Sequence, residues 1–266
     1  MTARGGSAGR DGAIRFGTSG WRGVLGDEFT LARARAVVRG VARLLRERGE
    51  PARVVLSADA RPGGARLVRE AAAVLASEDV RVERATGVTA TPVLARAVAR
   101  RRAGAGITFT ASHNPVAYQG LKVFASSGSV LDVGPTRRLE RLANRALGEA
   151  APARRRGSGA PGRAVDLVPE YRAALLGRLD REAFARSRPR VLYDALHGAG
   201  AGVLDGLLAE AGARVAGRRL ARDARFGGAG PDPVPARLGD LARAVAASRG
   251  ARVGLATDGD ADRYAA

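Results

Sequence analysis

Short apolar segments alternate with amphipathic helical segments along most of this chain, and that alternation limits the possible folds more than any other feature. Residues 52–59 (ARVVLSAD) are predicted to form a buried strand, and residues 30–48 place apolar side chains at the three- and four-residue spacing of one helix face. Another helix is expected to begin with Thr91 as its N-cap and Pro92 at its first helical position. The predicted strands are 52–59, 79–85, 105–112, one that begins at 189, 213–220 and 251–257; the predicted helices are 30–48, 64–77, 91–102, 169–179, one from about 203, and 238–248. Strands that alternate with helices in this way are typical of βαβ units, so we expect an α/β protein with two consecutive α/β/α domains and mostly parallel, mixed sheets.

The two predicted domains are separated by residues 148–164 (GEAAPARRRGSGAPGRA), which contain Gly, Pro, Ala and Arg without any periodicity. Such a composition is typical of a linker. The predicted division is therefore a first domain at 1–147, a linker at 148–164 and a second domain at 165–266. Because the last predicted strand, 251–257, is followed by little more than one polar loop, we expect the second domain to lack its final element.

Composition excludes several classes of protein. The chain contains no cysteine, which excludes a disulfide framework and a thiolate zinc site. It has no apolar run of about 18 residues and no apolar leader at its N-terminus, so a cytoplasmic protein without a membrane partner is expected. The net charge of +19 would attract polyanions, but the basic residues are scattered and all but Lys122 are arginine, as a GC-rich coding bias would produce. We therefore expect a solvated arginine-rich surface rather than nucleic acid as the main partner.

Three carboxylates, Asp258, Asp260 and Asp262, follow the last predicted strand directly. Loops at the carboxyl ends of parallel strands are where α/β folds bind ligands, and three hard oxygen ligands suit Mg²⁺ or Ca²⁺. An EF-hand is excluded because Arg263 stands where that loop needs glycine. The arginine beside the carboxylates indicates that an anion such as phosphate shares the site. A solvated acidic turn would give the same pattern.

Three further segments are candidates for chemistry. Ser112, followed by His113, comes directly after a predicted strand, as a nucleophile would, although Ser and Asn-Pro are also ordinary turn residues. The loop 17–23 (GTSGWRG) offers backbone amides and Arg22 to a phosphate, or is a plain turn. Lys122 is a candidate for proton transfer because lysine, unlike arginine, titrates when buried; it is otherwise an exposed strand residue.

Taken together and in this order, these segments resemble one family. The segments are 16–23 (FGTSGWRG), 110–115 (TASHNP), 118–123 (YQGLKV, with Gln119 where the family usually has Asn), 194–200 (DALHGAG) and 258–263 (DGDADR). The chain resembles the α-D-phosphohexomutase superfamily of phosphoglucomutases, phosphomannomutases and phosphoglucosamine mutases over residues 14–264.

The resemblance implies an activity and a set of site residues. Ser112 would carry a phosphoryl group and pass it to a hexose monophosphate, and a bound hexose 1,6-bisphosphate would return the other phosphate, which interconverts 1-phospho and 6-phospho sugars. The implied Mg²⁺ ligands are Ser112, Asp258, Asp260 and Asp262; the implied phosphate-binding residues are Arg22, Arg263 and Asn114; the implied catalytic residues are Ser112, Lys122, His113 and Arg22. Lys122, assisted by His113, would move the proton of the sugar hydroxyl. Hexose 1,6-bisphosphate is the expected activator.

The chain departs from the family in length. Family members usually have four domains, and neither the G-E-x-S-G motif of the third nor the phosphate loop of the fourth occurs here. We expect a truncated mutase that associates with itself or with a chain that supplies the missing domains. A non-catalytic metal- and phosphate-binding remnant is the first alternative, and a basic nucleic-acid-binding protein is the second. The segment 19–23 (SGWRG) differs from the DGIRG common in phosphoglucosamine mutases, so glucose or mannose phosphate is the expected substrate.

Overall fold

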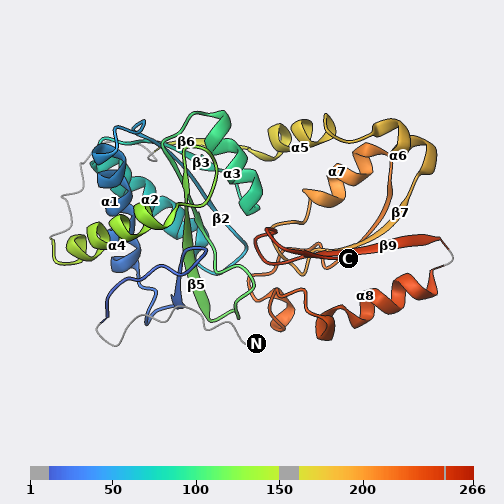
Figure 1. The fold of residues 1–266 in the computed structure, drawn as a ribbon. Coiled ribbons are helices and arrows are strands. Elements are labelled where there is room, and N and C mark those ends of the chain that lie inside the picture. Colours follow the sequence, from blue (N-terminus) through green and yellow to red (C-terminus); the bar gives the residue numbers. More distant parts are fainter. Residues whose placement is uncertain (1–11, 150–161, 249) are drawn as a thin grey trace.

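The computed structural model of the protein describes residues 12–149, 162–248 and 250–266, which form two α/β units side by side (Figure 1). In the first unit, a six-stranded sheet has the order β1-β5-β4-β2-β3-β6. Its elements are β1 (Trp21–Val24), α1 (Leu31–Glu47), β2 (Arg53–Ala58), α2 (Gly64–Ser77), β3 (Arg81–Ala85), α3 (Thr91–Arg100), β4 (Ala105–Phe109), β5 (Tyr118–Ala125), α4 (Val133–Leu147) and β6 (Arg163–Val165). Strands β4, β2, β3 and β6 are parallel, whereas β5 is antiparallel to both β4 and β1. The sheet is therefore mixed and mostly parallel.

Helices cover both faces of the first sheet. Alternate residues of β2 show the division: Val54 and Leu56 belong to a core beneath α1, α2 and α4, whereas Val55 belongs to a second core beneath α3. This is the expected consequence of strands whose successive side chains point to opposite faces, and it explains why β2 is apolar without alternation. Trp21, stacked on Phe29 with ring centroids 4.6 Å apart, closes the first core at the β1 edge.

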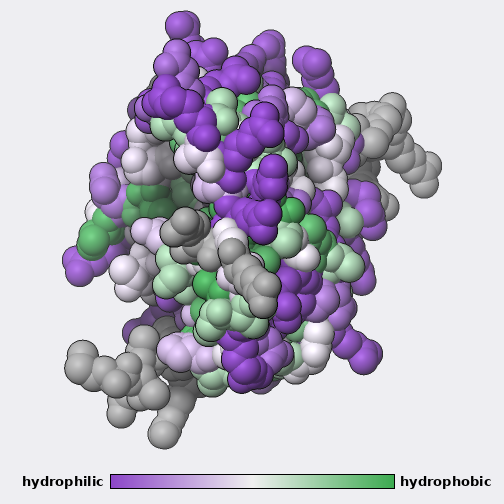
Figure 2. Space-filling model, turned by 90° about the vertical axis from the view of Figure 1, so that its right-hand side faces the viewer, coloured by the Kyte–Doolittle hydropathy of each residue, from purple (hydrophilic) through white to green (hydrophobic). Residues whose placement is uncertain are grey.

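The second unit has a four-stranded sheet in the order β10-β9-β7-β8, in which only β10 is antiparallel to its neighbour. Its elements are α5 (Val168–Leu176), α6 (Arg181–Ser187), β7 (Arg190–Asp194), α7 (Leu204–Ala211), β8 (Arg214–Arg218), the short helix η1 (Phe226–Gly228), α8 (Pro235–Ala247), β9 (Ala251–Thr257) and β10 (Tyr264–Ala265). Helices α5, α6 and α7 lie on one side of this sheet and α8 on the other (Figure 1). The outer end of the unit presents a mostly hydrophilic surface with smaller hydrophobic patches (Figure 2).

The two units are in contact through packed side chains and ion pairs. Leu167, Ala199 and Val203 join the core beneath α3. Arg101, after α3, donates to Glu83 of β3 at 2.8 Å and to Glu170 of α5 at 3.0 Å. The carboxyl ends of β4 and β9 also meet at this contact, because Ser112, after β4, lies within hydrogen-bond distance of Asp258, after β9.

The structure confirms the predicted α/β/α class with mixed, mostly parallel sheets. Strand β6, which begins at Arg163, pairs with β3 of the first sheet, although the predicted linker extends to residue 164. The residues of the linker at 150–161 lie outside the described part of the chain. One predicted detail is wrong: Ala90, not Thr91, is the N-cap of α3, and Thr91 and Pro92 are its first two residues. Within the described residues, no helix is both long enough and apolar enough to span a lipid bilayer.

Candidate active site

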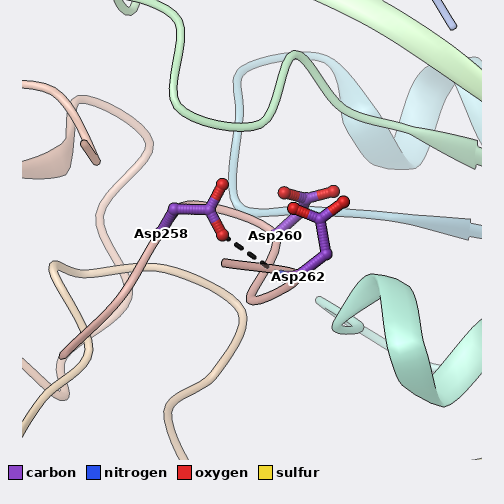
Figure 3. A group of neighbouring side chains, drawn as sticks. All are labelled: Asp258, Asp260 and Asp262. Carbon is purple, nitrogen blue, oxygen red and sulfur yellow. Dashed lines mark hydrogen bonds between the residues drawn. The ribbon is translucent and has the colours of Figure 1, made fainter. Parts of the chain in front are cut away.

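The three predicted carboxylates lie together on the loop that follows β9 (Figure 3). Oxygens of Asp258, Asp260 and Asp262 lie within 4.8 Å of one another. The loop is held in shape by its own backbone, because the Asp262 amide donates to Oδ1 of Asp258 at 3.1 Å and the Arg263 amide donates to the same oxygen at 3.2 Å. Asp258 and Asp260 are fully buried, whereas Asp262 is partly exposed.

This carboxylate group fits a hard divalent cation. Oxygen is the ligand atom that Mg²⁺ prefers, and several charged oxygens around one point are costly unless a cation neutralises them. Oδ1 of Asp260 is buried and has no hydrogen-bond partner among the described residues. A buried carboxylate oxygen without a partner is uncommon in folded proteins. Such an oxygen is available to a metal ion.

Ser112 of the first unit reaches this loop directly. It follows β4 and is fully buried, and its Oγ donates to Oδ2 of Asp258 at 2.7 Å. Nδ1 of His113 lies 3.4 Å from the same Oγ. The backbone φ of Ser112 is +54°, in the left-handed region that a non-glycine residue adopts only when its surroundings enforce it. The serine oxygen is therefore a fourth oxygen beside the carboxylates, supplied by the other unit.

Lys122 is the main positive charge within the carboxylate group. It lies on β5, is 1% exposed, and its Nζ contacts Oδ2 of Asp260 at 2.6 Å and Oδ2 of Asp262 at 2.5 Å. Burial by itself lowers the pKa of Lys122, but the two carboxylates outweigh that effect and raise it above its ordinary value. The structure thus excludes the exposed strand position for this residue and places its ammonium group against two of the three carboxylates.

The carboxylates differ in proton affinity. Burial, followed by the charge of Asp260, raises the pKa of Asp258 to about 7. Burial also acts to raise the pKa of Asp260, but Lys122 overcomes it and holds that pKa below its ordinary value. The Thr91 hydroxyl, which donates to Oδ2 of Asp260 at 2.5 Å, acts in the same direction.

Cationic side chains border the carboxylate group. Burial lowers the pKa of Arg22, on β1, and the nearby charges that act on it include Asp260 and Arg263. Its Nη1 donates weakly to Oδ1 of Asn114 at 3.4 Å, while its Nε is buried with no hydrogen-bond partner among the described residues. His113 is half-buried, and burial together with Arg263 and Arg22 lowers its pKa. The charges of Arg22 and Arg263 thus act together on His113 at this edge of the site.

Two glycine-containing loops pack closely against the backbone of segments that carry site residues. In the loop before β1, a Cβ on Gly20 would come within 2.4 Å of the Leu121 carbonyl, so glycine is needed for that turn to pack on β5. The amide of Gly17 is used inside the turn, where it donates to Gly20. After β7, a Cβ on Gly198 would come within 2.9 Å of the carbonyls of Asp258 and Gly259. This second loop therefore packs directly against the backbone of the carboxylate loop.

The structure brings together all of the predicted site residues, but the sequence analysis missed several neighbours. Arg61 and Asp59, directly after β2, are buried beneath the Ser112 loop, and Thr110 connects them to it. Thr91, predicted as a helix cap, instead donates to Asp260. A sequence signal existed for Asp59 and Arg61, because they follow a buried strand in the same way as Ser112 and Asp258 do.

Comparison with known proteins agrees with this arrangement. Residues 13–148 match the family profile for phosphoglucomutase/phosphomannomutase alpha/beta/alpha domain I, and residues 169–266 match that for domain II. A phosphoglucosamine mutase of Kineococcus radiotolerans is 36% identical over 93% of this chain and 55% of its own length. A phosphoglucomutase/phosphomannomutase of Thermococcus kodakarensis is 32% identical over 93% and 54%.

Solved structures give the same result. A phosphoglucomutase/phosphomannomutase family protein from Burkholderia thailandensis has a TM-score of 0.78 and 26% identity, and the match covers 92% of this chain and 52% of that one. The chain spans about half the length of the curated relatives it matches. With both domain profiles matched in order, the chain belongs to the phosphoglucomutase/phosphomannomutase family.

Proposed function

We propose that this chain carries the phosphoserine and metal half of a phosphohexomutase that interconverts hexose 1-phosphate and hexose 6-phosphate. The observation that supports this most strongly is the 2.7 Å contact between Ser112 Oγ of the first unit and Asp258 of the second. A serine hydroxyl on a group of three carboxylates is suited to carry a phosphoryl group beside a divalent cation.

In the proposed reaction, phosphorylated Ser112 donates its phosphoryl group to a hydroxyl of a hexose monophosphate. The bond between phosphorus and the serine oxygen breaks and a bond from phosphorus to the sugar oxygen forms. The amine of Lys122 accepts the proton of the sugar hydroxyl, and the released serine oxygen gains a proton, so that the net transfer leaves a serine hydroxyl. Arg22 and Arg263 would hold phosphate oxygens. The support is the charge of both side chains at the border of the site and the Nε of Arg22, which has no hydrogen-bond partner among the described residues. Asp258, Asp260, Asp262 and the serine oxygen would hold Mg²⁺, which supplies charge neutralisation of the transferring group when bound. The reverse transfer from the bisphosphate restores the phosphoserine.

Lys122 is proposed to move the hydroxyl proton, with His113 assisting. In the structure as it stands, the pKa of Lys122 is raised, so the ammonium form is favoured and the residue is ready to donate a proton. Once the carboxylate charge of Asp260 and Asp262 is neutralised, the same burial lowers its pKa, and the amine becomes a proton acceptor.

Glucose and mannose phosphates are the proposed sugars, a hexose 1,6-bisphosphate the proposed activator, and the cytoplasm the proposed location. Phosphoglucosamine mutases are among the relatives, so glucosamine 1-phosphate belongs in any substrate panel. Because the chain covers about half of those relatives, turnover is proposed to need the remaining domains, from a partner chain or from further sequence.

The test separates the half-reaction from turnover. Purified chain with Mg²⁺ and glucose 1,6-bisphosphate is expected to gain one phosphoryl group at Ser112, measured by intact-mass and peptide mass spectrometry. Ser112→Ala should abolish the gain, whereas Ser187→Ala, which removes an exposed hydroxyl on α6, should not change it. A coupled mutase assay on the sugar panel then measures turnover. Absence of phosphoryl uptake by the wild type would reject the enzymatic proposal in favour of a metal- and phosphate-binding remnant.

A further inference from the structure

Arg61 is a fully buried arginine whose guanidinium group donates hydrogen bonds to backbone carbonyls of the Ser112 loop. Its Nη2 donates to the carbonyls of Ser112 at 2.7 Å and Asn114 at 2.6 Å. Its Nη1 donates to the carbonyls of Pro115 at 2.9 Å and Tyr118 at 3.0 Å. One side chain thus gathers four carbonyls from the turn between β4 and β5. The planar fork of arginine allows this, and the point charge of lysine does not.

The same arginine is fixed in turn by Asp59. Its amide donates to Oδ1 of Asp59 at 2.9 Å, and its Nε lies 3.3 Å from Oδ2. The Thr110 hydroxyl also donates to that carboxylate at 2.6 Å and accepts the amide of Ser112 at 2.8 Å. Both the amide and the carbonyl of Ser112 are therefore connected to the end of β2, with the amide linked through Thr110 and the carbonyl bonded directly to Arg61.

This double attachment explains the backbone of Ser112. Its φ of +54° is costly for a residue with a side chain, and it persists only where surrounding contacts hold it. Turning this peptide back to an ordinary conformation would break the contact of its carbonyl with Arg61. It would also move Oγ away from Asp258.

Arg61 also touches the second unit. The ring of Phe226, in η1, lies under its guanidinium group with 5.2 Å from Cζ to the ring centroid. Phe226 is 3% exposed, so the contact is a packed one and not a chance surface approach. A Cβ on Gly259 would come within 2.9 Å of Pro231, in the same unit, and within 2.8 Å of the Ser112 carbonyl, in the first unit. Arg61 therefore contacts both the serine loop, through its carbonyls, and the second unit, through Phe226.

We propose that Arg61 is a positioning residue that holds Ser112 in its left-handed backbone conformation and, through Phe226, fixes the serine oxygen against the carboxylate loop of the second unit. The proposal rests on the proposed function for the role of Ser112 as phosphoryl carrier. The proposal assigns Arg61 no contact with substrate or metal. Its contribution is the placement of another residue.

The test uses Arg61→Met and Arg61→Lys in the full chain, with Arg39→Met as a matched control. Arg39 is likewise a buried arginine, 5% exposed, but it lies on α1, and its ion pairs with described residues are those with Glu78 and Glu149. Amide hydrogen exchange of the peptide 110–118 needs no activity. We expect the amide exchange rate there to rise about tenfold in both Arg61 variants. We also expect their free energy of unfolding to be no lower than that of the Arg39 variant. Exchange that stays at the wild-type rate in a folded Arg61→Met chain overturns the proposal.

Phosphoryl uptake from glucose 1,6-bisphosphate is the second readout. A displaced serine oxygen should slow the rate at saturating bisphosphate by about 10- to 100-fold, with little change in the half-saturating concentration. Restoration of the wild-type rate by Arg61→Lys would show that only the positive charge matters. It would contradict the role given to the planar guanidinium group.

If Arg61→Met does not fold, Phe226→Leu takes its place. The same rise in the exchange rate across residues 110–118 is expected, and its absence would contradict the proposed link between the two units. If the wild type takes up no phosphoryl group, the proposed function fails, while the exchange result still decides the role of Arg61.

Discussion

Asp258 is the residue at which protonation and metal binding compete most directly. Its pKa of about 7 lies above the ordinary value of 3.8, because burial and the neighbouring Asp260 disfavour its charge. A raised folded-state pKa means that the proton stabilises the fold at low pH, and that this contribution is lost as the pH rises from about 4 towards 7. A cation reverses that loss by taking the place of the proton.

Mg²⁺ affinity should therefore depend on pH in a defined direction. Below pH 7, each unit of acidification is expected to weaken Mg²⁺ binding about tenfold, and above pH 8 the affinity should level off. Isothermal titration calorimetry in buffers of different ionisation enthalpy measures both the affinity and the proton released. Asp258→Asn should bind more weakly but without the pH slope, and a slope that survives this substitution would assign the proton to another group.

At the same scale, local patterns predicted the polar residues that follow strands, whereas only the family resemblance placed Ser112 with the three carboxylates in one metal site. Ser112 and Asp258 are 146 positions apart, and only the folded chain brings them within hydrogen-bond distance. Asp59 and Arg61 follow a buried strand as Ser112 does, but Arg61 was missed because nothing in the local sequence distinguishes an arginine that binds carbonyls from a solvated one. Thr91 was assigned to helix capping because its local sequence fits that role equally well, and the partner that decides otherwise, Asp260, is 169 positions away.

Among the elements, β5 determines how closely the first sheet can pack at the site. Gly120 on β5 lies between β1 and the end of β4, where a Cβ would come within 2.6 Å of the Trp21 carbonyl and 2.7 Å of the Thr110 carbonyl. Because both neighbours are backbone atoms, Gly120→Ala should cost about 1–3 kcal/mol of unfolding free energy. Gly134→Ala, near the start of α4 with open space around it, should instead add about 0.4–1 kcal/mol. Urea denaturation of both variants checks the opposite signs; equal effects would contradict the packing argument.

The elements differed in how well the sequence predicted them. Helix α2 (Gly64–Ser77) and strand β9 (Ala251–Thr257) were predicted with their bounds, because their apolar periodicity and flanking polar residues agree. Strands β1, β6 and β10 were not predicted, since four residues or fewer carry too little periodicity to be distinguished from a loop. Their pairing is decided by the sheet edges beside which they lie. Strand β5 (Tyr118–Ala125) was also absent from the predicted strands, although residues 118–123 were singled out as a family motif.

At the scale of the whole molecule, the proposed ligands come from both units, so metal binding should stabilise their contact. Mg²⁺ at about 100 times its dissociation constant should add about 2.7 kcal/mol to the free energy of unfolding, and EDTA should remove it. Hydrogen-exchange protection should increase together in peptides 110–118 and 257–263. Asp260→Asn should abolish both effects, and protection confined to the second peptide would show that Ser112 takes no part in binding.

Strand β6 has a practical consequence for anyone who wishes to separate the two halves. The strand lies beyond the segment 150–161 in sequence, yet it completes the sheet of the first half by pairing with β3. A gene fragment that stops at residue 148 would leave β3 with an uncovered edge, and such edges recruit strands from other molecules. A fragment that runs to residue 166 keeps the edge covered. Precipitation of the shorter fragment would then reflect where the gene was cut and not an inability of the first half to fold.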